Sequence, residues 1–266
     1  MVPPLAIVIP ARYGARRFPG KPLVALRGAT GAAKSLIERS WEAACAAAPA
    51  EAVWVATDDD RIATAARGFG AQVVMTSPDC ANGTERVAEA AAALGLGEDS
   101  IVVNLQGDAP LTPPWFVAAL ATAMGAGVQM ATPVLRCTPE ALAHLRDDRR
   151  AGRVGATTAV FDRAGRALYF SKEVLPHTDA LAPGATVPVF HHVGVYAYRP
   201  AALAAYRSLP PGPLEALEGL EQLRFLENGV PVHCVEVDSR GRAFWEVNTP
   251  EDVPRVEAML AAEGIA

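Results

Sequence analysis

Four cationic side chains lie within ten residues near the start of the chain. They belong to a loop that also contains Gly14, Pro19 and Gly20, residue types that fix the path of a backbone or let it approach a ligand closely. The loop follows an apolar, largely β-branched run at 5–9, which predicts a buried strand. Ligands of open α/β sheets bind at the carboxyl ends of strands, so the loop is suited to a polyphosphate, with a solvated basic loop as the alternative. The four side chains are Arg12, Arg16, Arg17 and Lys21.

A carboxylate follows a second predicted strand, at 101–105. Asp108 comes directly after Gly107 and shortly before Pro110. A carboxylate at a strand end is a natural Mg²⁺ ligand, although an isolated Asp after Gly is usually a turn residue. Both strands are expected in one sheet, so Asp108 and the basic loop would share an edge. Together they predict a site for a polyphosphate and the magnesium ion that accompanies it.

Further polar groups gather at predicted helix positions. The segment 82–86, Asn-Gly-Thr-Glu-Arg, opens a helix whose backbone N–H groups can read a base edge or hold an anion, with a plain helix cap as the alternative. In the second half, Glu218 shares a helix face with Glu221 and Gln222. By itself that face would be only a solvated surface.

Two familiar nucleotide-binding motifs are missing. The segment 28–35 nearly spells the P-loop GxxxxGK[ST], but Ala33 stands where the second glycine should be and 24–27 is a poor buried strand. We expect instead a loop that closes onto a helix N-terminus. No GxGxxG follows the first strand, so a dinucleotide-binding oxidoreductase would lack its main fingerprint.

Composition excludes several classes of protein. A net charge of −5 and a pI near 5.6 argue against a nucleic-acid surface, which needs a broad excess of Lys and Arg. Four cysteines without CxxC spacing indicate reduced thiols rather than a disulfide or zinc framework. With no leader-like start and no apolar run near 18 residues, we expect a soluble cytoplasmic protein without membrane contact.

Strands and helices alternate through the first half, which predicts βαβ units and a mostly parallel sheet covered on both faces. After Pro139 the pattern changes to short strands, with a hairpin turning at 162–165, so we expect an insertion or subdomain. The expected strands are 5–9, 52–56, 72–75, 101–105, 129–134, 157–161, 167–170, 192–198 and 230–237. The expected helices are 34–48, 61–68, 86–94, 115–124, 214–227 and 250–262, the last with Thr249 as its cap.

Motifs along nearly the whole chain occur in the order found in one enzyme family. On these motifs the chain resembles 3-deoxy-manno-octulosonate cytidylyltransferase, also called CMP-KDO synthetase. The motifs are 11–13 with 17–22, 55–58, 82–86, 103–108, 167–171, 192–196, 220–224 and 249–252.

The resemblance implies an α/β architecture, the nucleotide-diphospho-sugar transferase (Rossmann-like) three-layer fold with a mostly parallel central sheet and a smaller β-rich insertion. It implies one domain, 1–266, with a nucleotide-binding part at about 1–135 and 230–266 and an acceptor and dimerisation insertion at about 136–229. The implied enzyme transfers CMP from CTP to the anomeric hydroxyl of 3-deoxy-D-manno-octulosonate (KDO) or a closely related 3-deoxy-2-keto sugar acid. Pyrophosphate is released, and the product serves lipopolysaccharide or surface-glycan synthesis. Mg²⁺ is the implied cofactor, CTP and the sugar acid are the small-molecule partners, and the implied assembly is a homodimer.

The resemblance also assigns roles to residues. Fixed cations and Mg²⁺ would stabilise the charge that builds on the phosphate oxygens, without a covalent intermediate. The implied catalytic residues are Arg12, Arg17, Lys21 and Asp108, with Asp108 as metal ligand. The implied nucleotide contacts are Ala11, Arg12, Lys21, Asn82, Gly83, Thr84 and Arg86. The implied acceptor contacts are Gln106, Lys172, His192, Tyr196, Glu221 and Gln222.

The chain departs from the family pattern at the metal and acceptor positions. Asn248 stands where the family has its second metal-binding aspartate, and a neutral amide is a weaker ligand for hard Mg²⁺. Glu246, two residues earlier in an extended segment, faces the same side, which makes it a candidate replacement ligand. Ala109 replaces an acid, and Thr158 stands where a lysine is expected. Lys172 replaces an arginine, which removes a bidentate carboxylate clamp.

Other hypotheses stay open at this point. Asn248 and Ala109 motivate a catalytically impaired nucleotide-binding homologue with a regulatory role. A cytidylyltransferase for a different acceptor is another, and a nucleotidyltransferase for a sugar 1-phosphate is disfavoured by the missing cation at Thr158. The sequence leaves open the acceptor, the strictness for CTP, the effect of Asn248 on activity and the dimer interface.

Overall fold

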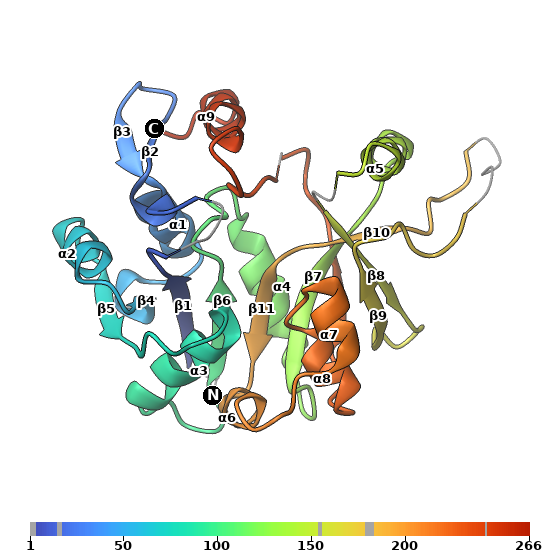
Figure 1. The fold of residues 1–266 in the computed structure, drawn as a ribbon, viewed down its shortest axis with the longest axis horizontal. Helices are drawn as coiled ribbons and strands as arrows, with labels where there is room; N and C mark the ends of the chain where they lie inside the picture. Colours follow the sequence, from blue (N-terminus) through green and yellow to red (C-terminus); the bar gives the residue numbers. More distant parts are fainter. Residues whose placement is uncertain (1–3, 15–17, 154–155, 179–183, 243) are drawn as a thin grey trace.

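The computed structural model describes residues 4–14, 18–153, 156–178, 184–242 and 244–266. These residues form one ten-stranded sheet in the order β5-β4-β1-β6-β11-β7-β10-β8-β9, with β12 paired to β7, and a separate β2–β3 hairpin (Figure 1). The strands are β1 (Leu5–Ala11), β2 (Ala25–Arg27), β3 (Ala33–Ser35), β4 (Val53–Thr57), β5 (Gln72–Met75), β6 (Ile101–Leu105), β7 (Met130–Arg136), β8 (Thr157–Phe161), β9 (Ala167–Ser171), β10 (Phe190–His192), β11 (Val195–Tyr198) and β12 (His233–Val237). The helices are α1 (Leu36–Cys45), α2 (Asp60–Gly68), α3 (Gly83–Ala93), α4 (Pro114–Ala123), α5 (Pro139–Arg150), α6 (Pro200–Tyr206), α7 (Pro213–Glu218), α8 (Leu223–Glu227) and α9 (Asp252–Ala262), with 3₁₀ turns η1 (Lys21–Leu23) and η2 (Ala50–Ala52).

Strands β5, β4, β1 and β6, at the left of Figure 1, form a parallel sheet. Ile7 of β1 lies opposite Val53 of β4 on one side and Val103 of β6 on the other. Successive side chains point to opposite faces, so Ile7 and Ile9 pack with α1, α2 and α4, whereas Val8 packs with α3 and α6. Helices therefore cover both faces of the sheet, which confirms the predicted three-layer α/β fold.

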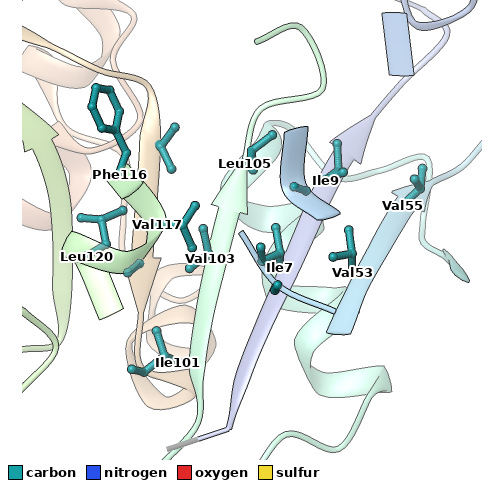
Figure 2. Close-up of a cluster of buried hydrophobic side chains, with 14 of the residues drawn as sticks. Ile7, Ile9, Val53, Val55, Ile101, Val103, Leu105, Phe116, Val117 and Leu120 are labelled. Carbon is teal, nitrogen blue, oxygen red and sulfur yellow. The ribbon is translucent and has the colours of Figure 1, made fainter. Parts of the chain in front are cut away.

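A continuous apolar core holds this part of the sheet in place. Figure 2 shows Val117 and Leu120 of α4 beside Val103 of β6, with Ile7 and Ile9 of β1 further along the same face. All five side chains are almost completely buried. Because the core fixes β1 and β6 relative to each other, it also fixes the loops that leave their carboxyl ends.

A late segment enters the centre of the sheet. Strand β11 lies between β6 and β7 and is antiparallel to both, with Val195 opposite Leu105 and Ala197 opposite Ala131. Strands β10, β8 and β9 continue the sheet as antiparallel strands at the right of Figure 1. The segment predicted as an insertion, 136–229, thus supplies a central strand as well as this extension, and the domain boundaries stay a prediction.

The helix predictions differ from the structure in their breaks, starts and number. The single helix expected at 214–227 is two helices, because Gly219 adopts a left-handed conformation (φ 62°) that ends α7. Helices α5 and α6 were not predicted; α5 buries only Leu142, Leu145 and Asp148, so its apolar periodicity is weak. Helix α9 begins at Asp252 rather than at residue 250.

The near-P-loop segment forms no phosphate loop. It turns between β2 and β3 and runs into α1, whose N-cap is Ser35. The Ser35 hydroxyl accepts a hydrogen bond from the backbone N–H of Glu38 at 3.3 Å. The expectation of a loop that closes onto a helix N-terminus is therefore confirmed.

Two further features agree with the composition. Within the part of the chain that the structure describes, no helix is both long and apolar enough to cross a bilayer. Cys45, Cys80, Cys137 and Cys234 are all free thiols.

Candidate active site

The basic loop and the acidic strand end meet directly. The Nζ of Lys21 lies 2.5 Å from Oδ2 of Asp108 and donates a second hydrogen bond, of 2.9 Å, to the backbone oxygen of Val247. The backbone oxygen of Asp108 in turn accepts from the N–H of Val247 at 2.9 Å. Three segments distant in sequence, after β1, after β6 and before α9, therefore converge on one ion pair.

The backbone ahead of Lys21 is shaped for this contact. Gly20 has φ 72°, a conformation that glycine adopts readily, and it starts the 3₁₀ turn η1. A Cβ at Gly20 would lie 3.2 Å from the ring of Tyr13, so the loop folds tightly over that ring. Arg61 of α2 stacks on Tyr13, 3.3 Å from its centroid. This packing holds Lys21 at the carboxyl edge of the sheet.

The other predicted residues of the basic loop differ in position. Ala11 ends β1, paired with Thr57 of β4, and Arg12 follows it with an exposed side chain. Arg16 and Arg17 lie outside the described residues. Among the described residues, Arg12 and Lys21 are the cations of this loop.

Glu246 and Asn248 extend the acidic side of the site. Burial and the neighbouring Asp108 raise the pKa of Glu246 to about 7, while Lys21 and a hydrogen bond with the Asn248 side chain oppose that shift. A Cβ at Gly194 would lie 3.0 Å from Oε1 of Glu246, so the start of β11 borders the same space. Ala109, where the family has an acid, is fully buried below the site. The oxygen donors gathered here are those that a hard divalent cation prefers.

Asp252 organises the segment that carries these ligand candidates. Its Oδ2 accepts from the backbone N–H groups of Asn248 (2.9 Å) and Thr249 (2.8 Å) and from the Thr249 hydroxyl (3.2 Å). Its Oδ1 accepts from Nε1 of Trp245 at 2.9 Å. Sequence reasoning gave Asp252 no role, although it lies in one of the quoted motifs; its signal is an acid at the first turn of a helix directly after the Asn-Thr-Pro turn.

The N-terminus of α3 already holds a carboxylate. Glu221 accepts hydrogen bonds from the backbone N–H of Gly83 (3.3 Å) and of Thr84 (3.0 Å), and from the Thr84 hydroxyl (2.8 Å). Asn82 caps the helix by accepting from the N–H of Glu85 at 2.9 Å. The structure thus brings predicted nucleotide contacts and a predicted acceptor contact together, at a helix end that favours negative charge.

Arg86 is anchored below this turn. Only 3% of the residue is exposed, and its Nη1 donates to the Thr76 hydroxyl at 2.5 Å. Its Nη2 lies 3.4 Å from Oδ1 of Asp58, at the end of β4. Arg86 therefore ties the start of α3 to the ends of β4 and β5.

Gln106 lies between the first turn of α3 and the acidic residues of the site. Its Nε2 donates to Oδ1 of Asn104 at 3.2 Å, and its Oε1 is 3.6 Å from the position that a Cβ at Gly83 would take. A Cβ at Gly194 would be 3.9 Å from its Cγ, so Gln106 also borders Glu246. Gln106 links the α3 turn to the acidic side of the site.

Tyr196 and Gln222 form a buried pair on the second half of the chain. The Tyr196 hydroxyl donates to Oε1 of Gln222 at 3.2 Å. The Nε2 of Gln222 is buried without a hydrogen-bond partner among the described residues. A buried donor of this kind is costly unless a ligand or water satisfies it.

His192 is held between two hydroxyls. Its Nε2 lies 3.0 Å from the Thr132 hydroxyl and its Nδ1 lies 3.1 Å from that of Thr157. Because Thr132 donates to the backbone oxygen of Val195, we assign the ring proton to Nε2, which donates to Thr132. Burial lowers the pKa of His192 to about 3, with His191 contributing. Both ring nitrogens are thus occupied inside the protein, and no sequence signal pointed to these threonines.

Lys172 lies apart, beside α7. Its backbone N–H donates to Oε2 of Glu218 at 2.8 Å, and its Nζ is 3.2 Å from the position of a Cβ at Gly219. Thr158 is buried, donates to the backbone oxygen of Glu173 and accepts from the N–H of Leu175. Thr158 therefore serves local structure here.

Known proteins match this chain over most of its length. A sequence profile described as "Cytidylyltransferase" matches residues 6–236. The chain is 48% identical over 259 residues to the 3-deoxy-manno-octulosonate cytidylyltransferase of Maricaulis maris, covering 97% of each. It is 40% identical over 262 residues to the 8-amino-3,8-dideoxy-manno-octulosonate cytidylyltransferase of Shewanella frigidimarina, covering 97% of this chain and 99% of that protein.

A solved structure is similar over the same length. It is a CMP:2-keto-3-deoxy-manno-octonic acid synthetase complexed with CTP, with a TM-score of 0.82 and 34% identity, covering 98% of this chain and 99% of the other. The roles assigned to single residues stay predictions.

Proposed function

The chain belongs to the cytidylyltransferase family, and from this premise we propose that it transfers CMP from CTP to KDO or a closely related 3-deoxy-2-keto sugar acid. The observation that carries the proposal is the Lys21–Asp108 ion pair of 2.5 Å at the carboxyl edge of the parallel sheet. This pair supports the proposal because a nucleoside triphosphate needs a cation for its phosphate oxygens and a carboxylate for its metal ion, and a lysine and an aspartate meet here.

The reaction is a displacement at phosphorus. The anomeric hydroxyl of the acid attacks the α-phosphorus of CTP and gives up its proton to solvent. A new P–O bond forms, the bond between the α-phosphorus and the oxygen that bridges to the β-phosphorus breaks, and pyrophosphate leaves. Arg12 and Lys21 would balance the charge that develops on the phosphate oxygens. His192 holds both of its ring nitrogens in internal hydrogen bonds, so no step is assigned to it.

Mg²⁺ fits the residues at this site. The ammonium of Lys21 already acts as a stand-in cation, bound by a carboxylate and a backbone carbonyl. Asp108 and Glu246 offer carboxyl oxygens and Asn248 an amide oxygen, all of the hard type that Mg²⁺ prefers. When bound, the ion would act as a Lewis acid on the phosphate oxygens.

The acceptor decides between the close alternatives. Relatives named for KDO and for its 8-amino form both match this chain over nearly its full length. We propose KDO as the first choice because the relatives named for it include the one at 48% identity.

A direct assay tests the proposal. Purified protein with CTP and Mg²⁺ is given KDO, the 8-amino acid or a sugar 1-phosphate, and pyrophosphate release and the mass of the CMP-linked product are measured. We expect turnover with an octulosonic acid and none with a sugar 1-phosphate. Tight CTP binding without turnover on any octulosonic acid would instead support the impaired homologue.

We also propose a homodimer built by the antiparallel extension, working in the cytoplasm. Leu168 of β9 and Leu217 of α7 are 62% and 81% exposed, and the two elements are joined by the hydrogen bond from Ser171 to Glu218. Contiguous exposed apolar patches mark protein interfaces, and we propose that these two side chains belong to one. Light scattering on protein eluting from a size-exclusion column tests the dimer, and Leu168→Glu is expected to give a monomer. The cytoplasmic location is supported by the free thiols, which fit a reducing compartment.

A further inference from the structure

Lys21 takes up the groups that a metal ion would need. Its ammonium bonds Oδ2 of Asp108 at 2.5 Å and the backbone oxygen of Val247 at 2.9 Å. The side chains of Lys21 and Asp108 are only 16% and 22% exposed, so water screens this pair less than a surface ion pair. Among the described residues, Lys21 is the cation bound to Asp108.

An ammonium and a divalent cation compete at such a place. Both need the lone pairs of Asp108, and two positive charges within a few ångströms repel each other strongly where water is partly excluded. Lys21 must therefore leave Asp108 before a divalent cation binds it well. A triphosphate offers Lys21 several charged oxygens in exchange.

The charges of the site favour the exchange once Lys21 has moved. Asp108 and Glu246 lie close enough to interact electrostatically, and Lys21, a cation of the described part of the loop, acts on both. When Lys21 turns to a phosphate, the two carboxylates are left without that counter-charge. A divalent cation restores it.

We propose that Lys21 occupies the cation site of the nucleotide-free protein and that the triphosphate draws it away, so that the divalent cation binds together with or after the nucleotide. This ordering rests on the proposed function in one respect, that the nucleotide is CTP. It gives Lys21 a second role besides phosphate binding, as the residue that makes metal binding depend on nucleotide. By linkage, the metal strengthens nucleotide binding by the same factor.

Mn²⁺ binding measured by electron paramagnetic resonance tests the proposal without any turnover. For the wild-type protein we expect Mn²⁺ affinity to rise at least tenfold when a non-hydrolysable α,β-methylene analogue of CTP is present, after correction for Mn²⁺ bound by free analogue. For Lys21→Gln we expect Mn²⁺ affinity in the absence of nucleotide to rise at least tenfold over wild type. Lys21→Met, which keeps the apolar stem, should behave in the same way and guards against a folding defect in one variant.

Lys34 offers the matched control. Its Nζ makes a comparable ion pair with Oε1 of Glu42, at 2.6 Å, away from the site. Lys34→Gln should leave Mn²⁺ binding unchanged, and Asp108→Asn should abolish it with and without nucleotide.

Two results would overturn the proposal. One is equal Mn²⁺ affinity of the wild-type protein with and without the nucleotide analogue. The other is unchanged nucleotide-free affinity in both folded Lys21 variants. Failure of the proposed function would give a different result. The protein would release no pyrophosphate with any sugar acid, but Mn²⁺ affinity without nucleotide would still differ between the wild-type protein and the Lys21 variants.

Discussion

Glu221 holds Thr84 at the first turn of α3 through two hydrogen bonds to one carboxylate oxygen, from the backbone N–H at 3.0 Å and from the hydroxyl at 2.8 Å. A residue from the segment between α7 and α8 thereby caps a helix of the nucleotide half. The two halves of the site are coupled through this contact, and five consequences of the site geometry can be measured.

Glu221→Ala should destabilise the protein by about 1–2 kcal/mol, because it removes a negative charge and its hydrogen bonds from a helix N-terminus. Glu221→Gln should cost less, since one amide oxygen still accepts. Urea unfolding measures both. Glu236→Gln, which breaks an ion pair with Arg136 whose side chains are 37% and 47% exposed, is the control and should stay below about 1 kcal/mol. Equal costs at both sites would mean that Glu221 does not cap α3.

Asp108→Asn should lower kcat at least about a hundredfold, since it removes a charged oxygen at the phosphate site. The free energy of unfolding should fall far less than turnover, because the backbone contact to Val247 remains and an asparagine oxygen can still accept from Lys21. Steady-state kinetics and urea unfolding on the same sample separate the two effects. A folded variant with wild-type turnover would remove Asp108 from the reaction.

Asn248→Asp should reduce activity about tenfold or more, although it restores the residue type of the family pattern. The Asn248 side chain hydrogen-bonds Glu246, and an aspartate would replace that favourable contact with a further negative charge beside Asp108 and Glu246. Glu246→Gln tests the partner and should raise the Mg²⁺ concentration needed for half-maximal rate. A large gain in turnover for Asn248→Asp would instead indicate a decayed enzyme.

Asp252→Ala should raise the Mg²⁺ concentration needed for half-maximal rate and lower the free energy of unfolding. Both follow because the substitution releases the turn at Asn248 and the indole of Trp245. We expect a loss of about 1.5–3 kcal/mol and a shift in Trp fluorescence. Asp162→Ala is the matched control, since Asp162 also accepts from two backbone N–H groups, those of Ala164 and Arg166, in the β8–β9 turn. The control should lose stability but keep its Mg²⁺ requirement.

His192 should make stability depend on pH below neutrality. Its pKa in the folded protein, about 3, lies below the unfolded value of 6.5, so its stabilising effect is complete above pH 6.5 and is lost as the pH falls. Between pH 6.5 and 5 the loss amounts to about 1.5 kcal/mol. Urea unfolding at both values should show a smaller drop for His192→Gln than for wild type. Equal drops would indicate that His192 is protonated in the folded protein.

Sequence reasoning located the acidic and basic parts of the site because both follow buried strands of one parallel sheet. Lys21 and Asp108 could be expected at the same edge for that reason. The contact of Lys21 with Val247 could not, since only the folded chain brings the segment before α9 to this place. The threonines around His192 were equally invisible, because they come from β7 and β8, strands whose register depends on the whole sheet.

Breaks within elements were hard to predict in strands and helices alike. The single strand expected at 192–198 is two strands, β10 and β11. The apolar and acidic pattern of 214–227 continues smoothly through Gly219, whose left-handed conformation depends on local packing that the pattern does not contain. The charged helix α5 was not predicted, because its few buried residues give little apolar periodicity. The resemblance supplied the acceptor residues, which no local pattern would have selected.

The place of β11 in the sheet has a consequence for how the protein can be made. A nascent chain that has emerged only to residue 135 contains the residues of β6 and most of those of β7 but lacks the strand that lies between them in the fold. Until residues 195–198 arrive, the inner edges of both strands expose unpaired backbone groups, which favours aggregation. The protein is therefore a poor candidate for division into separately expressed halves at the apparent domain boundary, and its folding should be slowed by this late, long-range closure.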